Sequence, residues 1–214
     1  MEIPLYFYFN LASIIIWLSV RTRLKESLLN KVGILISVSF FIEFGALIYS
    51  YSLRTSNHWI YNVYTTGQII SILYIYSKAI VNTHISKRIV FLAIIFFFLV
   101  IANLLLFQSF FRFHTYTYII GCFLIFYTSI EYLRQLLHQE NWIPLKRRPF
   151  FWITIGNIIY FVCSMFYLGS VNYILDKNLD EYGNLINLFV YLFTSVQFIF
   201  YSIAFLCNLD QKLS

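Results

Sequence analysis

The residues of this chain that could do chemistry are polar side chains inside long apolar stretches. Glu43 lies in the segment VSFFIEFGALIYS, near the middle of a predicted span and without a basic residue within one helical turn. A carboxyl group at that depth costs at least about 2.5 kcal/mol to insert and normally faces the interior of a helix bundle. Removal from water favours the neutral acid, which can donate a hydrogen bond. Glu43 is therefore either a proton-coupled or ligand-binding carboxyl, or a neutral hydrogen bond that joins two helices.

Uncharged polar residues recur at depth in the segment IYNVYTTGQII and in the last apolar stretch. In order, they are Asn62, Tyr64, Thr65, Gln68 and Gln197. The first segment can present several of them on one helical face, because Gln68 follows two of the others by three and four residues. Gln68 is expected near the depth of Glu43, so the sequence predicts a polar cluster of Glu43, Gln68 and Gln197 at the bundle centre. Such a cluster is either a binding site or a network that only fixes helix packing.

A second buried acid is predicted to have a local partner. Glu131 lies in FYTSIEYLRQLL, and Arg134 follows three residues later on the same helical face. Side chains at this spacing can form an intrahelical ion pair. We expect the pair to satisfy both charges near the end of a span and to be structural.

The sequence carries no pattern typical of an enzyme or a metal site. His58, His84, His114 and His138 are predicted at alternating membrane faces, where they cannot converge on one ion. Neither a His-Glu-x-x-His motif nor a Gly-x-Ser-x-Gly motif nor a phosphate-binding glycine loop is present. We therefore expect no catalytic residues, no metal and no cofactor, and we expect that the protein is not an enzyme.

The composition explains why these polar residues stand out. Of the 214 residues, 60% are hydrophobic and 11% are charged, and the mean hydropathy is +0.75. Soluble domains are about half apolar and a quarter charged, whereas disordered chains are polar and highly charged. Both classes are excluded, and the sequence predicts an integral membrane protein. The net charge of +6 belongs to loops between spans, so we expect no nucleic-acid partner.

Seven apolar stretches are long enough to cross a bilayer as helices, which takes about 17 to 25 residues. They cover about 4–20, 32–53, 59–80, 88–108, 114–137, 149–174 and 182–208. Each is apolar on all sides and the connections are short, so the sequence predicts an all-α, seven-transmembrane-helix bundle over 1–214 with antiparallel neighbours. Four tryptophans near the span ends are expected in the lipid interface: Trp17, Trp59, Trp142 and Trp152.

The distribution of basic residues predicts the orientation of this bundle. Twelve of the fifteen Lys and Arg residues belong to the first, third and fifth connections and the C-terminal tail. The other connections hold Arg54, Arg112 and Lys177. Because short loops rich in Lys and Arg stay in the cytoplasm, the N-terminus is expected outside and the C-terminus in the cytoplasm.

Two segments carry a resemblance to a known group of proteins. They are WIYNVYTTGQIISILYIY in the third span and RRPFFWITIGNIIYFVCSMFYL in the sixth. Over most of its length the chain resembles small uncharacterised seven-helix membrane proteins of Bacteroidota, whose genes look like neighbours of those for two-component sensor kinases. The resemblance implies a sensory or accessory role and carries over no catalytic residue. The group usually has an acid where Gln68 stands, so no proton-relay role is implied for the third span.

Two functions follow from these observations. The first is a sensory or interaction role in the inner membrane, in which the bundle passes a signal to a membrane partner such as a sensor kinase. The alternative is a small-solute or proton-coupled transporter or channel that uses the intramembrane carboxyl of Glu43. A transporter requires a continuous polar route across the bilayer, whereas a sensor requires one closed pocket or a lateral surface.

Overall fold

The computed structural model of the chain describes residues 4–24, 27–54, 56–138, 144–180 and 184–210, without the side chains of 184–187 and 208–210. Every regular element in these residues is helical. The long helices are α1 (Leu5–Val20), α2 (Ser27–Leu53), α3 (His58–Ala79), α4 (Thr83–Leu106), α5 (Thr115–Leu137), α6 (Pro149–Leu168) and α8 (Asn184–Asp210). Short elements are α7 (Val171–Asp176) and two single 3₁₀ turns, Arg21–Arg23 and Leu145–Arg147. This confirms a helical polytopic membrane protein.

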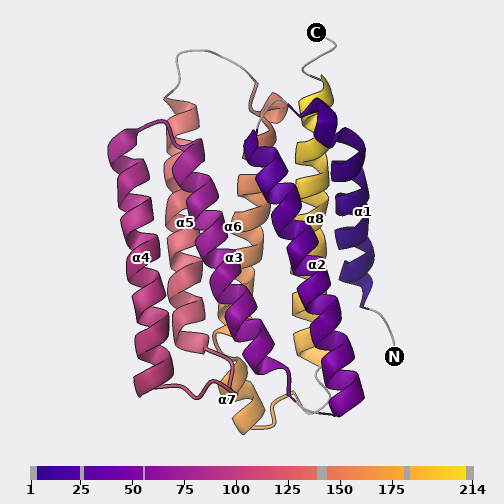
Figure 1. Cartoon of the computed structure of the whole chain (residues 1–214), viewed down its shortest axis with the longest axis vertical. Coiled ribbons are helices and arrows are strands. Elements are labelled where there is room, and N and C mark those ends of the chain that lie inside the picture. Colours follow the sequence, from indigo (N-terminus) through magenta and orange to yellow (C-terminus); the bar gives the residue numbers. More distant parts are fainter. Residues whose placement is uncertain (1–3, 25–26, 55, 139–143, 181–183, 211–214) are drawn as a thin grey trace.

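The long helices run side by side, and consecutive ones point in opposite directions (Figure 1). The N-terminal end of α1 and the C-terminal end of α8 lie at opposite ends of the bundle. Helix α8 packs most extensively on α6 and α1, and α6 also packs on α5, while α3 contacts α2, α4 and α5. The two ends of the chain therefore meet along α1 and α8 and close the bundle.

Six membrane spans, and not the predicted seven, are supported by length and composition within the described residues. They belong to α1, α2, α4, α5, α6 with α7, and α8. Helix α3 has 22 residues, but Asn, Thr, Gln and Ser side chains interrupt its apolar sequence. Its mean hydropathy is therefore too low for it to be counted as a span. A helix that contacts three neighbours can carry such groups, because they find partners inside the bundle.

The predicted span 149–174 is not one continuous helix. Helix α6 ends at Leu168, and the short α7 begins at Val171 after Gly169 and Ser170. A Cβ atom on Gly169 would lie 2.8 Å from Ile119 Cγ1, so a larger residue would push α6 away from α5 at this point. The break gives the bundle a short helical cap at the end where the N-terminus lies (Figure 1).

Helices α1 and α2 approach each other closely where a tryptophan packs on a glycine. Trp17 is only 8% exposed, and a Cβ atom on Gly33 would overlap its indole ring. Trp17 Nε1 also donates a hydrogen bond of 3.1 Å to Asn30 Oδ1. The predicted interfacial position of Trp17 is therefore wrong, because the side chain points into the helix contact instead of toward lipid; Trp142 lies outside the described residues.

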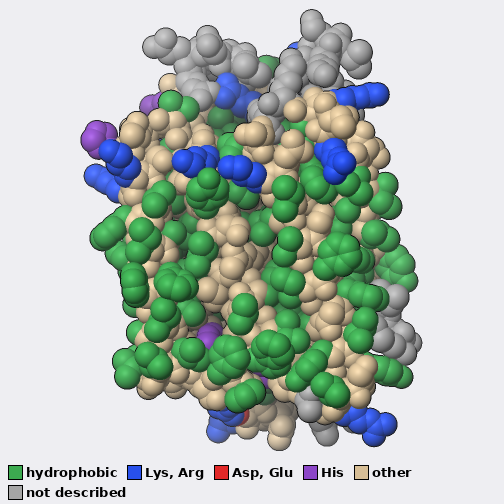
Figure 2. Space-filling view, viewed as in Figure 1, with side chains coloured by type: hydrophobic (Ala, Val, Ile, Leu, Met, Phe, Trp, Pro, Cys, Tyr) green, Lys and Arg blue, Asp and Glu red, His purple; other side chains and the backbone are tan. Residues whose placement is uncertain are grey.

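The described basic residues are divided unequally between the two ends of the bundle. Figure 2 shows Lys and Arg side chains near both ends of the visible face, most of them toward the end where the C-terminus lies. Arg54, Arg112 and Lys177 belong to the opposite end, as do the acidic Asp176 and Asp180, and Arg112 forms an ion pair with Asp176. Two further predicted members of the larger group, Lys25 and Lys212, lie outside the described residues. We call the end richer in Lys and Arg the basic end.

Candidate functional site

A cavity of about 390 Å³ enters the bundle from the end opposite the basic end. The side chains that line it come from α1, α2, α3, α6, α7, α8 and the connections beside them. They are Pro4, Tyr6, Glu43, Leu47, Asn57, His58, Tyr61, Tyr64, Thr65, Phe113, Tyr160, Leu168, Val171, Leu175, Val190, Tyr191 and Thr194. We refer to it as the tyrosine pocket.

Glu43 supplies the acid of the tyrosine pocket. It lies in the second half of α2 and is 7% exposed. Tyr64, from the N-terminal half of α3, donates a hydrogen bond of 3.1 Å from its hydroxyl to Glu43 Oε1. Tyr6, at the start of α1, lines the same cavity. The carboxyl group thus joins α2 to α3 and still contacts the cavity, to which Tyr6 brings α1.

Five tyrosines surround the cavity, and two pairs of them are in ring contact. The rings of Tyr6 and Tyr191 have centroids 5.3 Å apart, and those of Tyr61 and Tyr64 meet edge to face at 6.5 Å. Apart from Tyr64, the sequence did not single these residues out. Tyr61 could have been found from its position three residues before Tyr64, but Tyr6, Tyr160 and Tyr191 come from three other helices and join only in the folded bundle.

The outer rim of the pocket is fixed by polar contacts from α3 and α7. Asn62 Nδ2 donates to the carbonyl oxygens of Phe110 and Arg112, at 3.0 and 2.8 Å, and Asn62 Oδ1 accepts from the backbone N–H of His114. Asn172 of α7 donates to the Phe113 carbonyl at 2.8 Å. Asn62 therefore anchors the connection between α4 and α5, and its amide is occupied by backbone groups.

Gln197 belongs to a second polar network, nearer the basic end. Its Nε2 donates to Asn157 Oδ1 and to the Tyr201 hydroxyl, both at 3.0 Å, and Tyr201 in turn donates to Asn157. Asn157 Nδ2 donates at 3.3 Å to the hydroxyl of Tyr76, which also accepts from Ser129 at 3.0 Å. This Asn157 network joins α3, α5, α6 and α8.

The structure does not assemble the predicted cluster of Glu43, Gln68 and Gln197. Gln197 lies in the Asn157 network, and Gln68 is half-buried without a described hydrogen bond to either of the others. Thr65 lines the tyrosine pocket, but its hydroxyl donates to the Tyr61 carbonyl at 2.7 Å. These pairings depend on the direction in which each helix points its side chains. The spacing of residues within one helix does not give that direction relative to other helices.

The acid and base predicted to pair within the fifth span lie close together, away from the tyrosine pocket. Arg134 Nη2 is 2.9 Å from Glu131 Oε2 near the C-terminal end of α5. Both residues border a surface recess at the basic end together with Gln135 and His138. Their charges are balanced locally, as expected for residues near a span end.

The arrangement in the tyrosine pocket can bind and orient a small molecule through one carboxyl group, tyrosine hydroxyls and aromatic rings. Among the residues that the structure describes, no group of three or more His, Cys, Asp or Glu side chains could hold a metal ion. No family model matches the chain, and no curated protein or solved structure is significantly similar to it. The resemblance to the Bacteroidota proteins therefore stays a prediction.

Proposed function

We propose that this multi-pass membrane protein is a sensor that binds a small molecule in the tyrosine pocket and passes the signal to a membrane partner. The observation that carries the proposal is the position of the cavity. Its lining residues all lie in the half of the bundle opposite the basic end, and its deepest ones, such as Glu43 and Thr194, lie ten residues from the helix ends at Leu53 and Asn184. At about 1.5 Å per residue, the cavity reaches about halfway across the bilayer.

The lining favours a small organic molecule that carries an amine. Glu43 is the single acid among the residues that line the pocket. A bound ammonium group would neutralise a carboxylate that is otherwise costly at this depth, and tyrosine rings attract a cation at their faces. The remaining walls are apolar, from residues such as Leu47 and Phe113, and suit the hydrocarbon part of the ligand.

Two helices connect the tyrosine pocket to the Asn157 network. On α8, Thr194 lines the pocket and Gln197 follows one turn later in the network. On α6, Tyr160 lines the pocket and Asn157 lies one turn away. A ligand that separates or draws together α6 and α8 would therefore act on a buried hydrogen-bonded network, which has few alternative arrangements. This continuity supports a signalling role.

The unequal distribution of basic residues supports an orientation for this sensor. With α3 counted as a crossing helix, this distribution supports a topology in which the N-terminus and the tyrosine pocket are outside and the basic end is in the cytoplasm. We assign the protein to the inner membrane. The short cytoplasmic connections leave the output to a partner, and a membrane-bound sensor kinase is the partner that the predicted resemblance implies.

Ligand binding is tested with purified protein in lipid nanodiscs. The melting temperature is measured with a panel of small aliphatic and aromatic amines and with the alcohols of the same shape. We expect at least one amine to raise the melting temperature, its alcohol to have no effect, and Glu43→Gln to abolish the rise. Glu131→Gln, which removes a half-buried acid outside the pocket, is the matched control and keeps the rise. A rise that survives Glu43→Gln, or no rise with any amine, contradicts the proposal.

A transporter is the second candidate, and the hydrogen-bonded carboxyl of Glu43 at mid-bilayer depth favours it. The two functions differ in liposomes, where pH-dependent flux of protons and small ions is recorded for the wild type and Glu43→Gln. Flux in the wild type that is lost in a stable Glu43→Gln variant establishes the transporter and rejects the sensor. A sensor shows no flux in either protein.

A further inference from the structure

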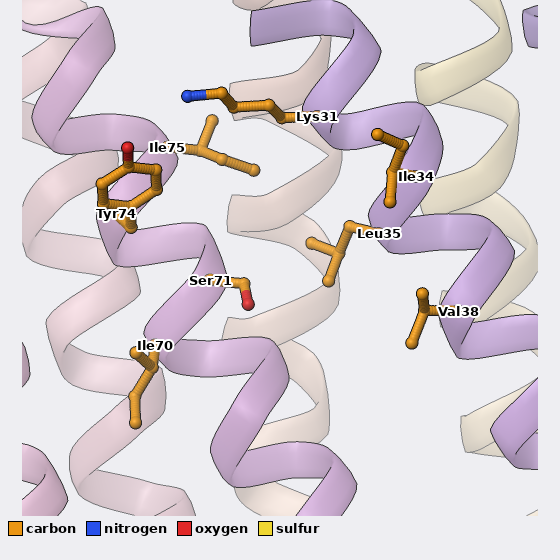
Figure 3. Close-up of a pocket in the computed structure, with 8 residues that line it drawn as sticks. All are labelled: Lys31, Ile34, Leu35, Val38, Ile70, Ser71, Tyr74 and Ile75. Atoms are coloured by element: carbon orange, nitrogen blue, oxygen red, sulfur yellow. The ribbon is translucent and has the colours of Figure 1, made fainter.

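A groove of about 480 Å³ lies between α2 and α3, away from the tyrosine pocket. It is formed by the first half of α2 and the second half of α3, so it lies in the half of the bundle at the basic end. Its lining is Lys31, Ile34, Leu35, Val38, Ile70, Ser71, Tyr74 and Ile75 (Figure 3). We call it the α2–α3 groove.

The lower part of the α2–α3 groove has the character of a lipid-facing surface. Ile34 is 55% exposed and Val38 is 46% exposed, and both belong to α2; Figure 3 shows Ile34 at the level of Ile75 and Val38 lower down, nearer the level of Ile70. These apolar side chains are separated along the helix axis by one turn, so the apolar lining runs lengthwise along the bundle. In a bilayer such a surface is covered by hydrocarbon chains, which are the solvent at this depth.

The upper part of the groove is lined by Lys31 and Tyr74, and a second cation, Lys78, lies over the same Tyr74 ring. Lys31 Nζ, from α2, lies 4.9 Å from the centroid of the Tyr74 ring, and Lys78 Nζ, from α3, lies 5.6 Å from the same centroid. Figure 3 shows Lys31 extended toward α3, above the apolar residues. The ion pairs found in the described part of the chain involve other residues. Both ammonium groups lie within about 6 Å of one ring centroid, so an anion bound beside this ring would be attracted by both.

Positive charge at one end of a lengthwise apolar groove matches one kind of occupant. A glycerophospholipid has a phosphate at the depth of the span ends and acyl chains that run parallel to the helices. A soluble phosphate compound would use the cations and leave the apolar walls uncovered, whereas a neutral lipid would leave the two ammonium groups unbalanced. Only an anionic phospholipid satisfies both parts, because a zwitterionic headgroup brings its own cation.

We propose that the α2–α3 groove binds one anionic phospholipid from the leaflet at the basic end. Its phosphate lies between Lys31 and Lys78, and an acyl chain runs along Ile34, Val38 and Ile70. The Ser71 hydroxyl, which points into the groove below the cations, is available to the glycerol ester region (Figure 3). The name of that leaflet rests on the proposed orientation, but the binding itself does not depend on the proposed sensor function.

The experiment counts phospholipids retained by the purified full chain. The protein is reconstituted with phosphatidylcholine alone or with phosphatidylcholine and phosphatidylglycerol, and retained lipids are measured by native mass spectrometry. We expect one phosphatidylglycerol to be retained in preference to phosphatidylcholine. The variant Lys31→Gln/Lys78→Gln weakens that retention by at least about tenfold, since each cation near an anionic lipid contributes about 1 kcal/mol. Lys31→Arg/Lys78→Arg keeps the charges and retains the lipid.

Two further variants test whether lipid retention depends on this groove and not on the charge of the basic end in general. Arg21→Gln/Lys87→Gln removes two exposed cations of the same end that neither line the groove nor lie over the Tyr74 ring, and should leave retention unchanged. Val38→Trp fills the apolar part with both lysines intact and should also weaken retention. If the double lysine variant does not fold, Lys78→Gln alone serves, because this side chain is exposed.

Three results would overturn the proposal. The first is equal retention of phosphatidylglycerol by Lys31→Gln/Lys78→Gln and by Arg21→Gln/Lys87→Gln. The second is retention of phosphatidylcholine equal to that of phosphatidylglycerol. The third is displacement of the lipid by glycerol 3-phosphate at comparable concentration, which would make the site one for a soluble phosphate and not for a bilayer lipid.

Discussion

Tyr64 and Glu43 join the third and second helices through a hydrogen bond of 3.1 Å from the phenol hydroxyl to the carboxyl oxygen, at the wall of the tyrosine pocket. The bond crosses a helix contact in the apolar part of the bundle, where each partner would otherwise leave a polar group without water. Glu43 accordingly has a structural partner and an open face on the cavity. The two roles can be separated by substitution.

The hydrogen bond between Tyr64 and residue 43 should be kept when the Glu43 carboxyl is replaced by an amide. In Glu43→Gln, the amide oxygen still accepts the hydrogen of Tyr64, so we expect a melting temperature in detergent close to that of the wild type. Glu43→Leu leaves the Tyr64 hydroxyl without its acceptor and should cost about 1 to 3 kcal/mol. Tyr64→Phe in the Glu43→Leu background removes the orphaned hydroxyl and should recover part of that loss. A Glu43→Leu variant as stable as Glu43→Gln would show that the bond contributes little.

Two buried asparagines should respond in opposite directions to the same substitution. Asn10 of α1 and Asn157 of α6 are 0% and 1% exposed, but Asn10 has no described hydrogen bond on either side-chain atom, whereas Asn157 bonds to Tyr76, Gln197 and Tyr201. Asn10→Leu removes an unsatisfied polar group and should raise the melting temperature. Asn157→Leu leaves several partners unsatisfied and should lower stability by about 2 kcal/mol or more.

Thermal unfolding of both variants in one detergent measures this difference directly. Asn10→Ala distinguishes a polarity effect from the larger volume of leucine. A fall in melting temperature for Asn10→Leu and for Asn10→Ala would mean that the Asn10 amide has a partner in the membrane-embedded protein.

Two glycines of α2 offer a matched test of the contact between α1 and α2. A Cβ on Gly33 would overlap the Trp17 ring, whereas a Cβ on Gly45 has no neighbouring atom within 4 Å. Gly33→Ala should separate the helices and lower stability by about 1 to 3 kcal/mol, as overpacked contacts do. Gly45→Ala should be neutral or stabilise by up to about 1 kcal/mol, because alanine favours the helix. Thermal unfolding followed by circular dichroism measures both, and equal effects would refute the close approach at Gly33.

Asn62 should stabilise the connection between α4 and α5 at the rim of the tyrosine pocket. Asn62→Ala removes three hydrogen bonds to the connection between α4 and α5 and should increase hydrogen exchange in residues 107–114. Thr66→Ala is the control on the same helix, because the Thr66 hydroxyl donates to the Asn62 carbonyl and not to that connection. Exchange that is unchanged in Asn62→Ala would show that other contacts hold the connection.

Stability should fall as the pH is lowered toward 5. Burial lowers the pKa of His114, which precedes the first residue of α5 and is 5% exposed, below its ordinary value of 6.5. In the unfolded chain this imidazole takes up a proton near pH 6.5, while in the folded protein it stays neutral to lower pH. The stabilisation by neutral His114 is therefore complete above pH 6.5 and is lost as the pH falls from 6.5 through the folded-state pKa.

The melting temperature measured between pH 7.5 and pH 5 checks this dependence. His114→Gln should flatten the fall, and His84→Gln, at an exposed position on α4, should not change it. A fall of the same size in His114→Gln and in the wild type would assign the pH dependence to other groups.

The amino-acid sequence was enough to predict the class of the protein and the approximate positions of its long helices. A bilayer requires long apolar segments whose backbone groups hydrogen-bond within the segment, and such segments can be recognised in the sequence alone. Stretches such as 88–108 and 114–137 therefore coincide with α4 and α5 to within about five residues. The spacing of Glu131 and Arg134 likewise predicted an ion pair, because both partners belong to one turn of one helix. Local features of this kind depend on neighbours in sequence.

Which polar residues contact one another depends on how the helices pack together. Tyr6, Tyr160 and Tyr191 come to Glu43 from three helices far apart in the chain, while Gln197 turns to Asn157 instead of Glu43. The burial of Trp17 against Gly33 and the break after Leu168 also arise from contacts with a neighbouring helix. Apolar helices carry little sequence information about their rotation, because lipid and protein interior favour the same side chains. The rotation of each helix, and with it the tyrosine pocket, is fixed only when the helices pack together.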